Sequence, residues 1–217
     1  MRATAIIPVK RFTAAKQRLD AALEPQARES LAAAMLGDVL AAVERSSSLE
    51  RVIVVSDEPG VRGVARAPGA ELLGDPSDAD HSRAAARGVE RALGRDADAV
   101  ALLPGDCPLL DPDELDAALS RVAPKRVGIV PDRHGTGTNA LLLAPPDAIE
   151  PAFGEDSRAR HERLARAAGQ KVAIERLDSL ALDVDTPDDL AALREVLSRT
   201  PGRAPRTAAL LHAPARA

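Results

Sequence analysis

The sequence AVALLPGDCPLL at residues 99–110 joins an apolar run to a polar turn that carries one carboxylate, Asp106. The segment 99–103 is short and uniformly apolar, which is typical of a strand that is buried on both faces of a sheet. A helix start follows directly in DPDELDAALS. A buried strand, a polar loop and a helix form the repeating unit of α/β proteins with parallel sheets. We therefore expect residues 99–103 at the centre of such a sheet, with Asp106 beyond the strand's carboxyl end.

The same alternation extends along the chain in both directions. Apolar runs rich in β-branched residues alternate with longer segments of helical periodicity. The sequence predicts further strands at residues 4–9, 51–56, 70–74, 126–131, 139–144 and 171–176. It predicts helices at residues 25–46, 60–66, 82–93, 157–169 and 186–199, the last with Thr186 as N-cap and Pro187 at N1. The fold class predicted is α/β, with helices on both faces of a mostly parallel sheet.

The 217 residues suit one domain, which we place at residues 1–199. Aromatic residues make up only 1% of the chain, so alanine, leucine and valine must fill the core. Residues 200–217 lose periodicity and gain proline and arginine, so we expect a mobile C-terminal tail. The alternative is a strap that lies over a partner subunit through AALL at residues 208–211.

Charge and cysteine content exclude several classes of protein. The net charge of −4 is spread over interspersed acidic and basic residues, which argues against a general nucleic-acid binder. The single cysteine, Cys107, excludes an internal disulfide framework and favours a cytoplasmic protein, in which we expect this thiol to be a small packing residue. No apolar run approaches the ~20 residues needed to span a membrane, and no signal peptide is expected at residues 1–10.

The first segment with chemical interest follows the first predicted strand. Ligands of open parallel sheets bind beyond the carboxyl ends of the strands. VKRFTAAKQRL places Lys10, Arg11, Lys16 and Arg18 there, and such a cluster can neutralise a triphosphate and the charge of a leaving pyrophosphate. A solvated basic loop is the alternative. Neither GxxxxGK[ST] nor GxGxxG occurs here, which disfavours a P-loop kinase or a dinucleotide dehydrogenase.

Acidic residues at two strand ends indicate a metal site. Asp106 can hold a hard cation, since Mg²⁺ prefers oxygen ligands and commonly takes one or two protein carboxylates plus substrate phosphates. In DVDTPDDL, Asp183 and Asp185 lie two residues apart, so both point to one face of an extended segment while Val184 points to the other. Each aspartate taken singly could instead be a cap or a turn residue.

Two further segments can bind an anion. DRHGTGTN at residues 132–139 has the glycines and threonines of an anion-binding turn, although a plain hairpin turn has them too. FGEDSRARH puts Gly154 and Ser157 at a helix start, where free N–H groups favour phosphate or carboxylate. Asp156 or Ser157 could be only an N-cap there. We expect His161 to be an inert surface residue on this arginine-rich helix, with assistance to anion binding, together with Arg158 and Arg160, as the alternative.

Five segments in this order, IIPVKRFTAAKQRL, PGDCPLL, DRHGTGTNALLL, FGEDSRARH and LDVDTPDDL, resemble the guanylyltransferases of coenzyme F-420 biosynthesis. These enzymes act on 2-phospho-L-lactate or phosphoenolpyruvate. The resemblance implies a single Rossmann-like, GT-A-like nucleotidyltransferase domain. It also implies transfer of GMP from GTP to one of these acids, with release of pyrophosphate and with Mg²⁺ as cofactor.

The resemblance also assigns roles to residues. The positions that match the family's nucleotide-binding and catalytic loop are Pro8, Val9, Lys10, Lys16 and Arg18. Those that match its site for the phosphorylated acid are Thr138, Gly154 and Ser157. Mg²⁺ would be held by Asp106 and by an aspartate of the DVD segment, with Asp183 as first choice and Asp185 as second.

One segment departs from the family pattern. Where relatives tend to carry a GLNxA-like sequence, this chain has DADHSRAAARG at residues 78–88, with only Ala84 and Gly88 in keeping. This segment would face the nucleotide, so the base preference is less firmly implied than the fold. The alternatives are an acceptor such as 3-phosphoglycerate, a molybdopterin or a sugar phosphate, or a non-catalytic nucleotide-sensing domain. Leu142 and Leu143, expected near a sheet edge, could support a homodimer.

Overall fold

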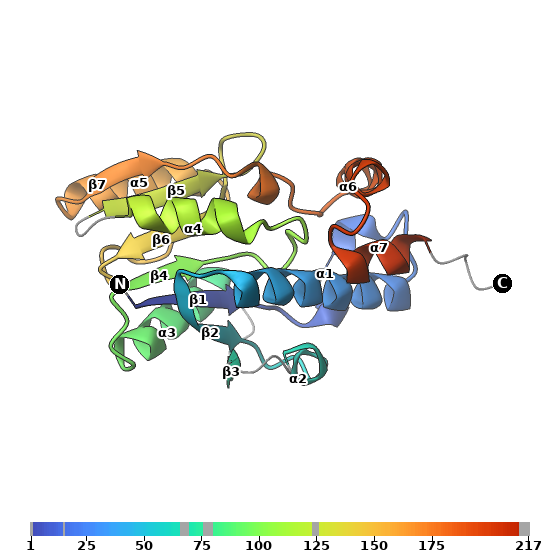
Figure 1. The fold of residues 1–217 in the computed structure, drawn as a ribbon, viewed down its shortest axis with the longest axis horizontal. Helices are drawn as coiled ribbons and strands as arrows, with labels where there is room; N and C mark the ends of the chain where they lie inside the picture. The colour runs from blue at the N-terminus through green and yellow to red at the C-terminus, as the bar shows by residue number, and fades with distance from the viewer. Residues whose placement is uncertain (1, 15, 66–69, 76–79, 123–125, 213–217) are drawn as a thin grey trace.

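A computed structural model describes residues 2–14, 16–65, 70–75, 80–122 and 126–212, and within them the chain forms one α/β domain (Figure 1). The seven-stranded sheet has the order β3-β2-β1-β4-β6-β5-β7. The strands are β1 Ala3–Pro8, β2 Leu49–Val55, β3 Ala70–Leu73, β4 Ala99–Leu102, β5 Arg126–Pro131, β6 Thr138–Ala144 and β7 Lys171–Ile174. Each corresponds to a strand predicted from the sequence.

Helices alternate with these strands as predicted. They are α1 Pro25–Arg45, α2 Val61–Val64, α3 His81–Leu93, α4 Pro112–Arg121, α5 Ser157–Ala167, α6 Pro187–Arg199 and α7 Pro205–His212. Thr186 caps α6 through a reciprocal capping box with Asp189, and Pro187 is at N1, which confirms that prediction. Residues 66, 78 and 79, which we assigned to a helix and to the departing segment, lie outside the described residues.

The sheet is mostly parallel, and β4 is its middle strand, as the opening segment predicts. β1 pairs in parallel with both β2 and β4, while β6 runs antiparallel to β4 and to β5. The chain therefore leaves β1 toward one side of the sheet and β4 toward the other. Such a switch in direction opens a crevice at the carboxyl ends of the two strands, where the loops after Pro8 and Leu102 lie.

Helices cover both faces of the sheet (Figure 1). On one face, α1 and α4 belong to the apolar cluster that contains the alternate β1 residues Ala5 and Ile7. On the other, α3 packs against β1 at Ile6, and α5 packs against β5 and β7. These clusters consist largely of alanine, leucine, valine and isoleucine, as the low aromatic content requires. Alternate side chains of β1 point to opposite faces of the sheet, and both sets are buried. The loop that follows β1 therefore starts from a rigid strand.

Gly88 allows α3 to approach β1 closely. A Cβ atom at this position would lie 2.3 Å from Ile6 Cγ2 and 3.2 Å from Val55 Cγ2. Real Cβ atoms do not come so close to a neighbour, so any side chain here would push α3 away from the sheet. This gives a physical reason for the glycine that the departing segment shares with the family.

The predicted mobile tail is wrong for residues 205–212, which form α7 against α1 (Figure 1). Asp38 of α1 is buried, and its carboxylate accepts the backbone N–H groups of Arg206 and Thr207 at 3.1 and 2.8 Å. This carboxylate caps the amino end of α7, and the Thr207 side chain is fully buried. Residues 213–217 lie outside the described residues.

The location expected for Leu142 and Leu143 is also wrong. Strand β6 lies between β4 and β5, so neither residue is near a sheet edge, and both are fully buried. Their side chains are part of the core and cannot form a subunit contact. Among the described residues, no helix combines the length and apolar character needed to cross a membrane.

Candidate active site at the carboxyl edge of the sheet

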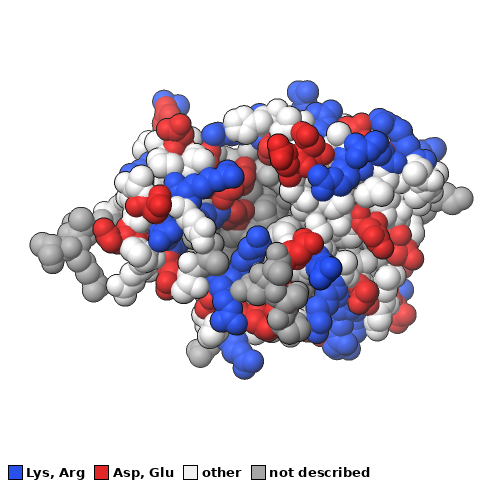
Figure 2. Space-filling view, turned by 180° about the vertical axis from the view of Figure 1, so that it is seen from behind, with Lys and Arg blue, Asp and Glu red and all other residues white. Residues whose placement is uncertain are grey.

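A cavity of about 790 Å³ opens at the carboxyl edge of the sheet. Figure 2 shows a hollow near the middle of one face, bordered by both acidic and basic side chains. Arg11 of the basic cluster is not among the lining residues of this cavity, whereas all the residues to which the resemblance assigns a role line it: Pro8, Val9, Lys10, Lys16, Arg18, Asp106, Thr138, Gly154, Ser157, Asp183 and Asp185. The fold thus brings together segments that lie up to 177 positions apart in the sequence.

Lys16 lies among the carboxylates of the cavity. It has a left-handed backbone (φ 57°) and its side chain is only 6% exposed. Its ammonium group contacts Asp106 Oδ2 and lies 2.8 Å from Asp185 Oδ1. Burial alone would lower the pKa of this ammonium, but the charges of Asp106 and then Asp185 outweigh it and raise the pKa above its usual value. Lys16 therefore stays charged and joins the two acidic segments.

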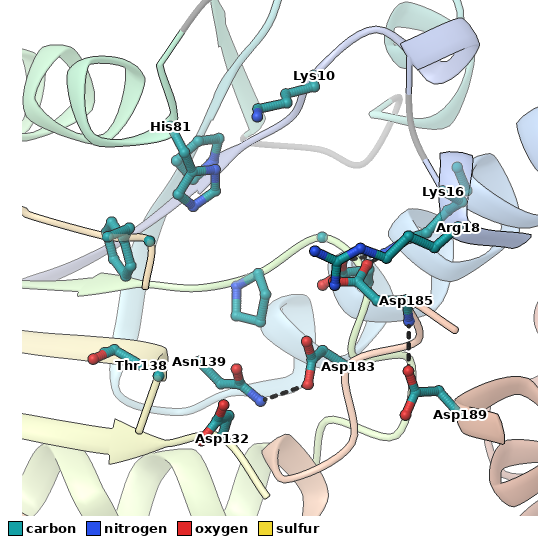
Figure 3. Close-up of a pocket in the computed structure, with 18 of the residues that line it drawn as sticks. Lys10, Lys16, Arg18, His81, Asp132, Thr138, Asn139, Asp183, Asp185 and Asp189 are labelled. Carbon is teal, nitrogen blue, oxygen red and sulfur yellow. Dashed lines mark hydrogen bonds and ion pairs between the residues drawn. The ribbon is translucent and has the colours of Figure 1, made fainter. Parts of the chain in front are cut away.

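Asp183 lies near Lys16 and its two partners, but among the described residues it forms no ion pair. It accepts a long, 3.4 Å hydrogen bond from Asn139 Nδ2, whose shorter bond goes to the Leu180 carbonyl (Figure 3). Burial, followed by the nearby charge of Asp106, raises the pKa of Asp183 above its usual value. Val184 is fully buried on the opposite side, as period-two spacing predicts. The cluster of Asp106, Asp183 and Asp185 thus carries more negative charge than Lys16 neutralises.

The donor set at this cluster fits a hard divalent cation. Asp106 and Asp185 converge on one positive charge, the Lys16 ammonium, and Asp183 is close enough to Asp106 for its pKa to respond to that charge. In the described part of the chain, no group of three or more His, Cys, Asp or Glu side chains is arranged to hold a metal by itself. One or two carboxylates completed by substrate phosphates are the usual ligands of Mg²⁺.

The turn between β5 and β6 forms another wall of the cavity. It is a hairpin turn, held where Asp132 Oδ1 accepts the Thr136 N–H at 3.0 Å. A Cβ atom at Gly137 would lie 2.7 Å from Asp132 Oδ2, so a side chain there would displace the Asp132 carboxylate that holds the turn. Arg158 of α5 donates to the Gly135 carbonyl at 3.0 Å, which ties the turn to the start of that helix. The interpretation of residues 132–139 as a hairpin turn is therefore correct, and the same turn also lines the cavity.

The start of α5 lies next to that turn. Gly154 has φ of 111°, a conformation that strongly favours glycine, and Ser157 is 1% exposed at the first helical position. Asp156 occupies the N-cap position, but its side chain makes no capping hydrogen bond. The N–H groups of Ser157 and Arg158 already donate to the Gly154 and Thr136 carbonyls, so the helix dipole is what favours an anion at this end of the cavity.

The prediction that His161 lies on the surface is wrong. Its side chain is fully buried, with Nδ1 3.0 Å from Thr138 Oγ1 and Nε2 2.9 Å from the Ala152 nitrogen. Its ring packs edge-on against Phe153, at 5.2 Å between centroids. Burial, and then the charge of Arg160, lower the pKa of this imidazole to about 4. His161 therefore supports the cavity wall from behind and is neutral near pH 7.

The departing segment has structural roles of its own. Asp80 caps α3, and the Ser82 hydroxyl accepts the Phe153 N–H at 2.9 Å. His81 lines the cavity and packs edge-on against Phe153, at 5.0 Å between centroids (Figure 3). Burial, and then the charge of Lys10, lower the pKa of His81, against an opposing effect of Asp106. The segment thus links the start of α3 to the loop that carries Gly154.

The segment with His81 was expected to face the nucleotide, and His81 does line the cavity. Several other polar residues that line it were not predicted as site residues, including Asp132, Arg133, Asn139 and Asp189. Asp132 and Asn139 are the first and last residues of the DRHGTGTN segment, so the proposed anion-binding role of that segment could have identified them as site residues. Asp189 of the capping box forms a 2.7 Å ion pair with Arg133, which joins the hairpin turn to α6. No local pattern predicts that pairing, because it depends on how two distant loops meet.

Comparison with known proteins identifies the family. The model of the family described as "Guanylyl transferase CofC like" matches residues 3–200. A phosphoenolpyruvate guanylyltransferase of Conexibacter woesei is 50% identical over 210 residues, 96% of this chain and 94% of that protein. One from Sphaerobacter thermophilus is 40% identical over 193 residues, 89% of this chain and 93% of that protein.

Solved structures show the same fold at low identity. A nucleotidyl transferase from Methanothermobacter thermautotrophicus matches with a TM-score of 0.71 at 16% identity, over 91% of this chain and 98% of that one. A Mycobacterium tuberculosis protein in complex with manganese matches with a TM-score of 0.59 at 19% identity, over 90% and 99%. The match of the family model to nearly the whole chain, together with these relatives, leads to one conclusion: the chain belongs to the guanylyl transferase CofC-like family and is an enzyme of the nucleotidyltransferase type.

Proposed function

We propose that this enzyme transfers GMP from GTP to phosphoenolpyruvate and releases pyrophosphate. One observation carries the proposal: a single cavity is lined by a basic loop, an acidic cluster and the start of helix α5. This arrangement suits two phosphorylated substrates that meet beside a divalent cation. The choice of phosphoenolpyruvate rests on the names of relatives that are 40–50% identical to this chain.

Lys10, Lys16 and Arg18 would bind the triphosphate. All three project from the loop after β1 toward the cavity (Figure 3). Their positive charges can neutralise the phosphates in the ground state and the additional charge on pyrophosphate as it leaves. The backbone at Pro8 and Val9 lines the same wall and would border the nucleoside.

Thr138, Gly154 and Ser157 would hold the phosphorylated acid. They lie where the hairpin turn meets the amino end of α5, whose helix dipole favours an anion. The two binding walls face a common space, so a bound acid phosphate could approach the α-phosphorus of GTP. Holding the two reactants in this way replaces a bimolecular encounter with an oriented one.

In the reaction, a phosphate oxygen of phosphoenolpyruvate forms a bond to the α-phosphorus of GTP, and the bond from that phosphorus to the oxygen bridging to the β-phosphate breaks. The electron pair of the broken bond leaves with pyrophosphate. The attacking phosphate is already an anion near neutral pH, so no general base is needed. The residues of this chain then act by orientation and by charge.

Asp106 and Asp183, with Asp185 as the alternative to Asp183, would hold Mg²⁺. Bound there, the ion would neutralise charge on the α-phosphate and on the leaving pyrophosphate. Support comes from the uncompensated negative charge of the aspartate cluster and from the manganese complex of the mycobacterial protein that shares this fold. The Val184 N–H, which donates to the Asp106 carbonyl at 3.4 Å, keeps the DVD segment beside Asp106.

The test is pyrophosphate release from GTP, Mg²⁺ and phosphoenolpyruvate, with the product identified by mass spectrometry. Parallel reactions should contain 2-phospho-L-lactate, 3-phosphoglycerate or a sugar phosphate as acceptor, and ATP or CTP in place of GTP. We expect the highest kcat/KM with GTP and phosphoenolpyruvate. Faster turnover with another acid would correct the substrate, and GTP binding without release for any acceptor would favour the nucleotide-sensing alternative.

A further inference from the structure

We propose that His161 is a positioning residue that fixes the direction of the Thr138 hydroxyl hydrogen, so that this hydroxyl donates a hydrogen bond to the acid substrate in the cavity. The inference deepens the proposed function and rests on it. His161 itself does not line the cavity, whereas Thr138 does. The residue would therefore act on the substrate only through Thr138.

The backbone at Ala152 determines the tautomer of His161. An amide N–H can only donate, and the Ala152 nitrogen lies 2.9 Å from His161 Nε2, so Nε2 must be the unprotonated acceptor. The opposite tautomer would bring two N–H groups against each other in a buried site. The proton of the neutral ring is therefore on Nδ1.

The tautomer in turn determines the role of Thr138. His161 Nδ1 lies 3.0 Å from Thr138 Oγ1 and donates its hydrogen to that oxygen. The Thr138 hydroxyl therefore keeps its own hydrogen for another acceptor. Among the described residues, no other hydrogen bond of the Thr138 side chain is formed. The hydroxyl can therefore present a donor, rather than lone pairs, to an anionic ligand in the cavity.

The surroundings keep His161 neutral and its ring fixed. The side chain is fully buried, and its ring packs edge-on against Phe153. The charge that lowers the pKa of His161 is the guanidinium of Arg160, its sequence neighbour, which donates a hydrogen bond to the Ala152 carbonyl. With a pKa of about 4, the imidazole remains neutral at the pH of turnover, so the Nδ1–H donor is permanent.

Two substitutions separate the two hydrogen bonds of His161. In His161→Asn, the side-chain amide can replace the Nδ1–H donor to Thr138 but not the Nε2 acceptor. In His161→Gln, the longer side chain can replace the acceptor for Ala152 but not the donor. We expect His161→Gln to raise KM for phosphoenolpyruvate by about 10- to 100-fold, the usual worth of a hydrogen bond to a charged ligand. His161→Asn should stay within about threefold of the parent.

The kinetic pattern distinguishes positioning from structural support. Positioning predicts that KM for GTP changes little in either variant, and that His161→Gln has no further effect on KM for phosphoenolpyruvate in a Thr138→Val background. Equal losses in both variants, or equal effects on both substrates, would overturn the positioning role. A parent enzyme that shows no turnover with phosphoenolpyruvate would overturn the proposed function, and the inference with it.

A spectroscopic measurement tests the tautomer without any substrate. In ¹⁵N NMR spectra of the free protein, a protonated and an unprotonated imidazole nitrogen resonate far apart, and the His161→Asn spectrum identifies the signals of His161 among those of the four histidines. We expect Nδ1 protonated and Nε2 unprotonated between pH 6 and 8. A proton on Nε2, or a titration of this ring near pH 6.5, would contradict the proposal.

Discussion

Lys16 Nζ lies 2.8 Å from Asp185 Oδ1, and the same ammonium group contacts Asp106. The chain thus places its own cation between two of the three carboxylates to which we assign metal binding. A basic side chain from the loop after β1 and acidic side chains from two later segments meet at one point of the cavity (Figure 3). In the free protein, Lys16 partly neutralises the charge that would attract a divalent cation.

Replacement of Lys16 should therefore have opposite effects on metal and on nucleotide. Lys16→Met leaves the three aspartates without their cation, so we expect Mn²⁺ to bind the nucleotide-free protein about tenfold more tightly. Loss of a phosphate-binding charge should lower kcat/KM for GTP by about 10²-fold. Titration calorimetry and steady-state kinetics measure the two effects.

Lys10→Met is the matched control, because Lys10 lines the same cavity but no ion pair joins it to Asp106 or Asp185 in the described residues. This variant should weaken GTP use without tightening Mn²⁺ binding. Unchanged or weaker Mn²⁺ binding in Lys16→Met would contradict the view that this ammonium neutralises the metal site.

The aspartates themselves should differ in their effect on metal affinity. Asp106→Asn should lower turnover by about 10³-fold or more while the protein stays folded. Asp183→Asn should weaken Mn²⁺ binding more than Asp185→Asn, because Asp183 has no cation partner among the described residues whereas Asp185 already has Lys16. Electron paramagnetic resonance of bound Mn²⁺ provides the measurement, and the reverse order would make Asp185 the second ligand.

The sequence predicts the fold and the membership of the site because both depend on local patterns. Apolar strands end at particular residues, and parallel strands bring their carboxyl ends to one edge, so Asp106 and the loop after β1 had to be neighbours. The sequence does not predict that Lys16 pairs with Asp106 and Asp185, because that contact depends on the left-handed backbone at Lys16. It also left open which aspartate completes the proposed metal site.

Both errors at His161 and at α7 have the same physical origin. Composition marked each segment as solvent-exposed: arginines surround His161, and proline and arginine fill residues 200–206. In each case one buried polar side chain accepts hydrogen bonds from backbone N–H groups. His161 accepts from Ala152, and Asp38 accepts from two residues of α7. Such a contact needs only one side chain and leaves no periodic signal in the sequence.

The attachment of α7 should depend on Asp38. Asp38→Ala removes the acceptor for the N–H groups of Arg206 and Thr207, at a cost of about 1–3 kcal/mol to the docked helix. Hydrogen exchange of residues 205–212 should become markedly faster, while β1 and β4 keep their protection. Glu44→Ala, an exposed change on the same α1 helix, is the control and should leave α7 unchanged. Equal exchange rates in parent and Asp38→Ala would show that packing alone holds α7.

Acid should weaken the contact between α1 and α4 through Asp116. This carboxylate of α4 accepts hydrogen bonds from the hydroxyl groups of Ser46 and Ser47 and from the backbone N–H groups of Ser47 and Ser48. Partial burial would raise the pKa of Asp116, but the hydrogen bonds from Ser46 and then Ser47 outweigh it and lower the pKa from 3.8 to about 2.

A depressed pKa in the folded state means that the ionised carboxylate stabilises the fold above pH 3.8 and loses this effect as the pH falls toward 2. Asp116→Ala should therefore lower the free energy of unfolding by about 1 kcal/mol at pH 7, a value typical of a lost cap on a partly buried group. The difference between variant and parent should shrink below pH 4 in urea titrations followed by circular dichroism. Asp113→Ala, a substitution in the first turn of the same helix, gives the control for general acid effects. A difference that stays constant from pH 7 to pH 3 would show that Asp116 acts through packing instead of its charge.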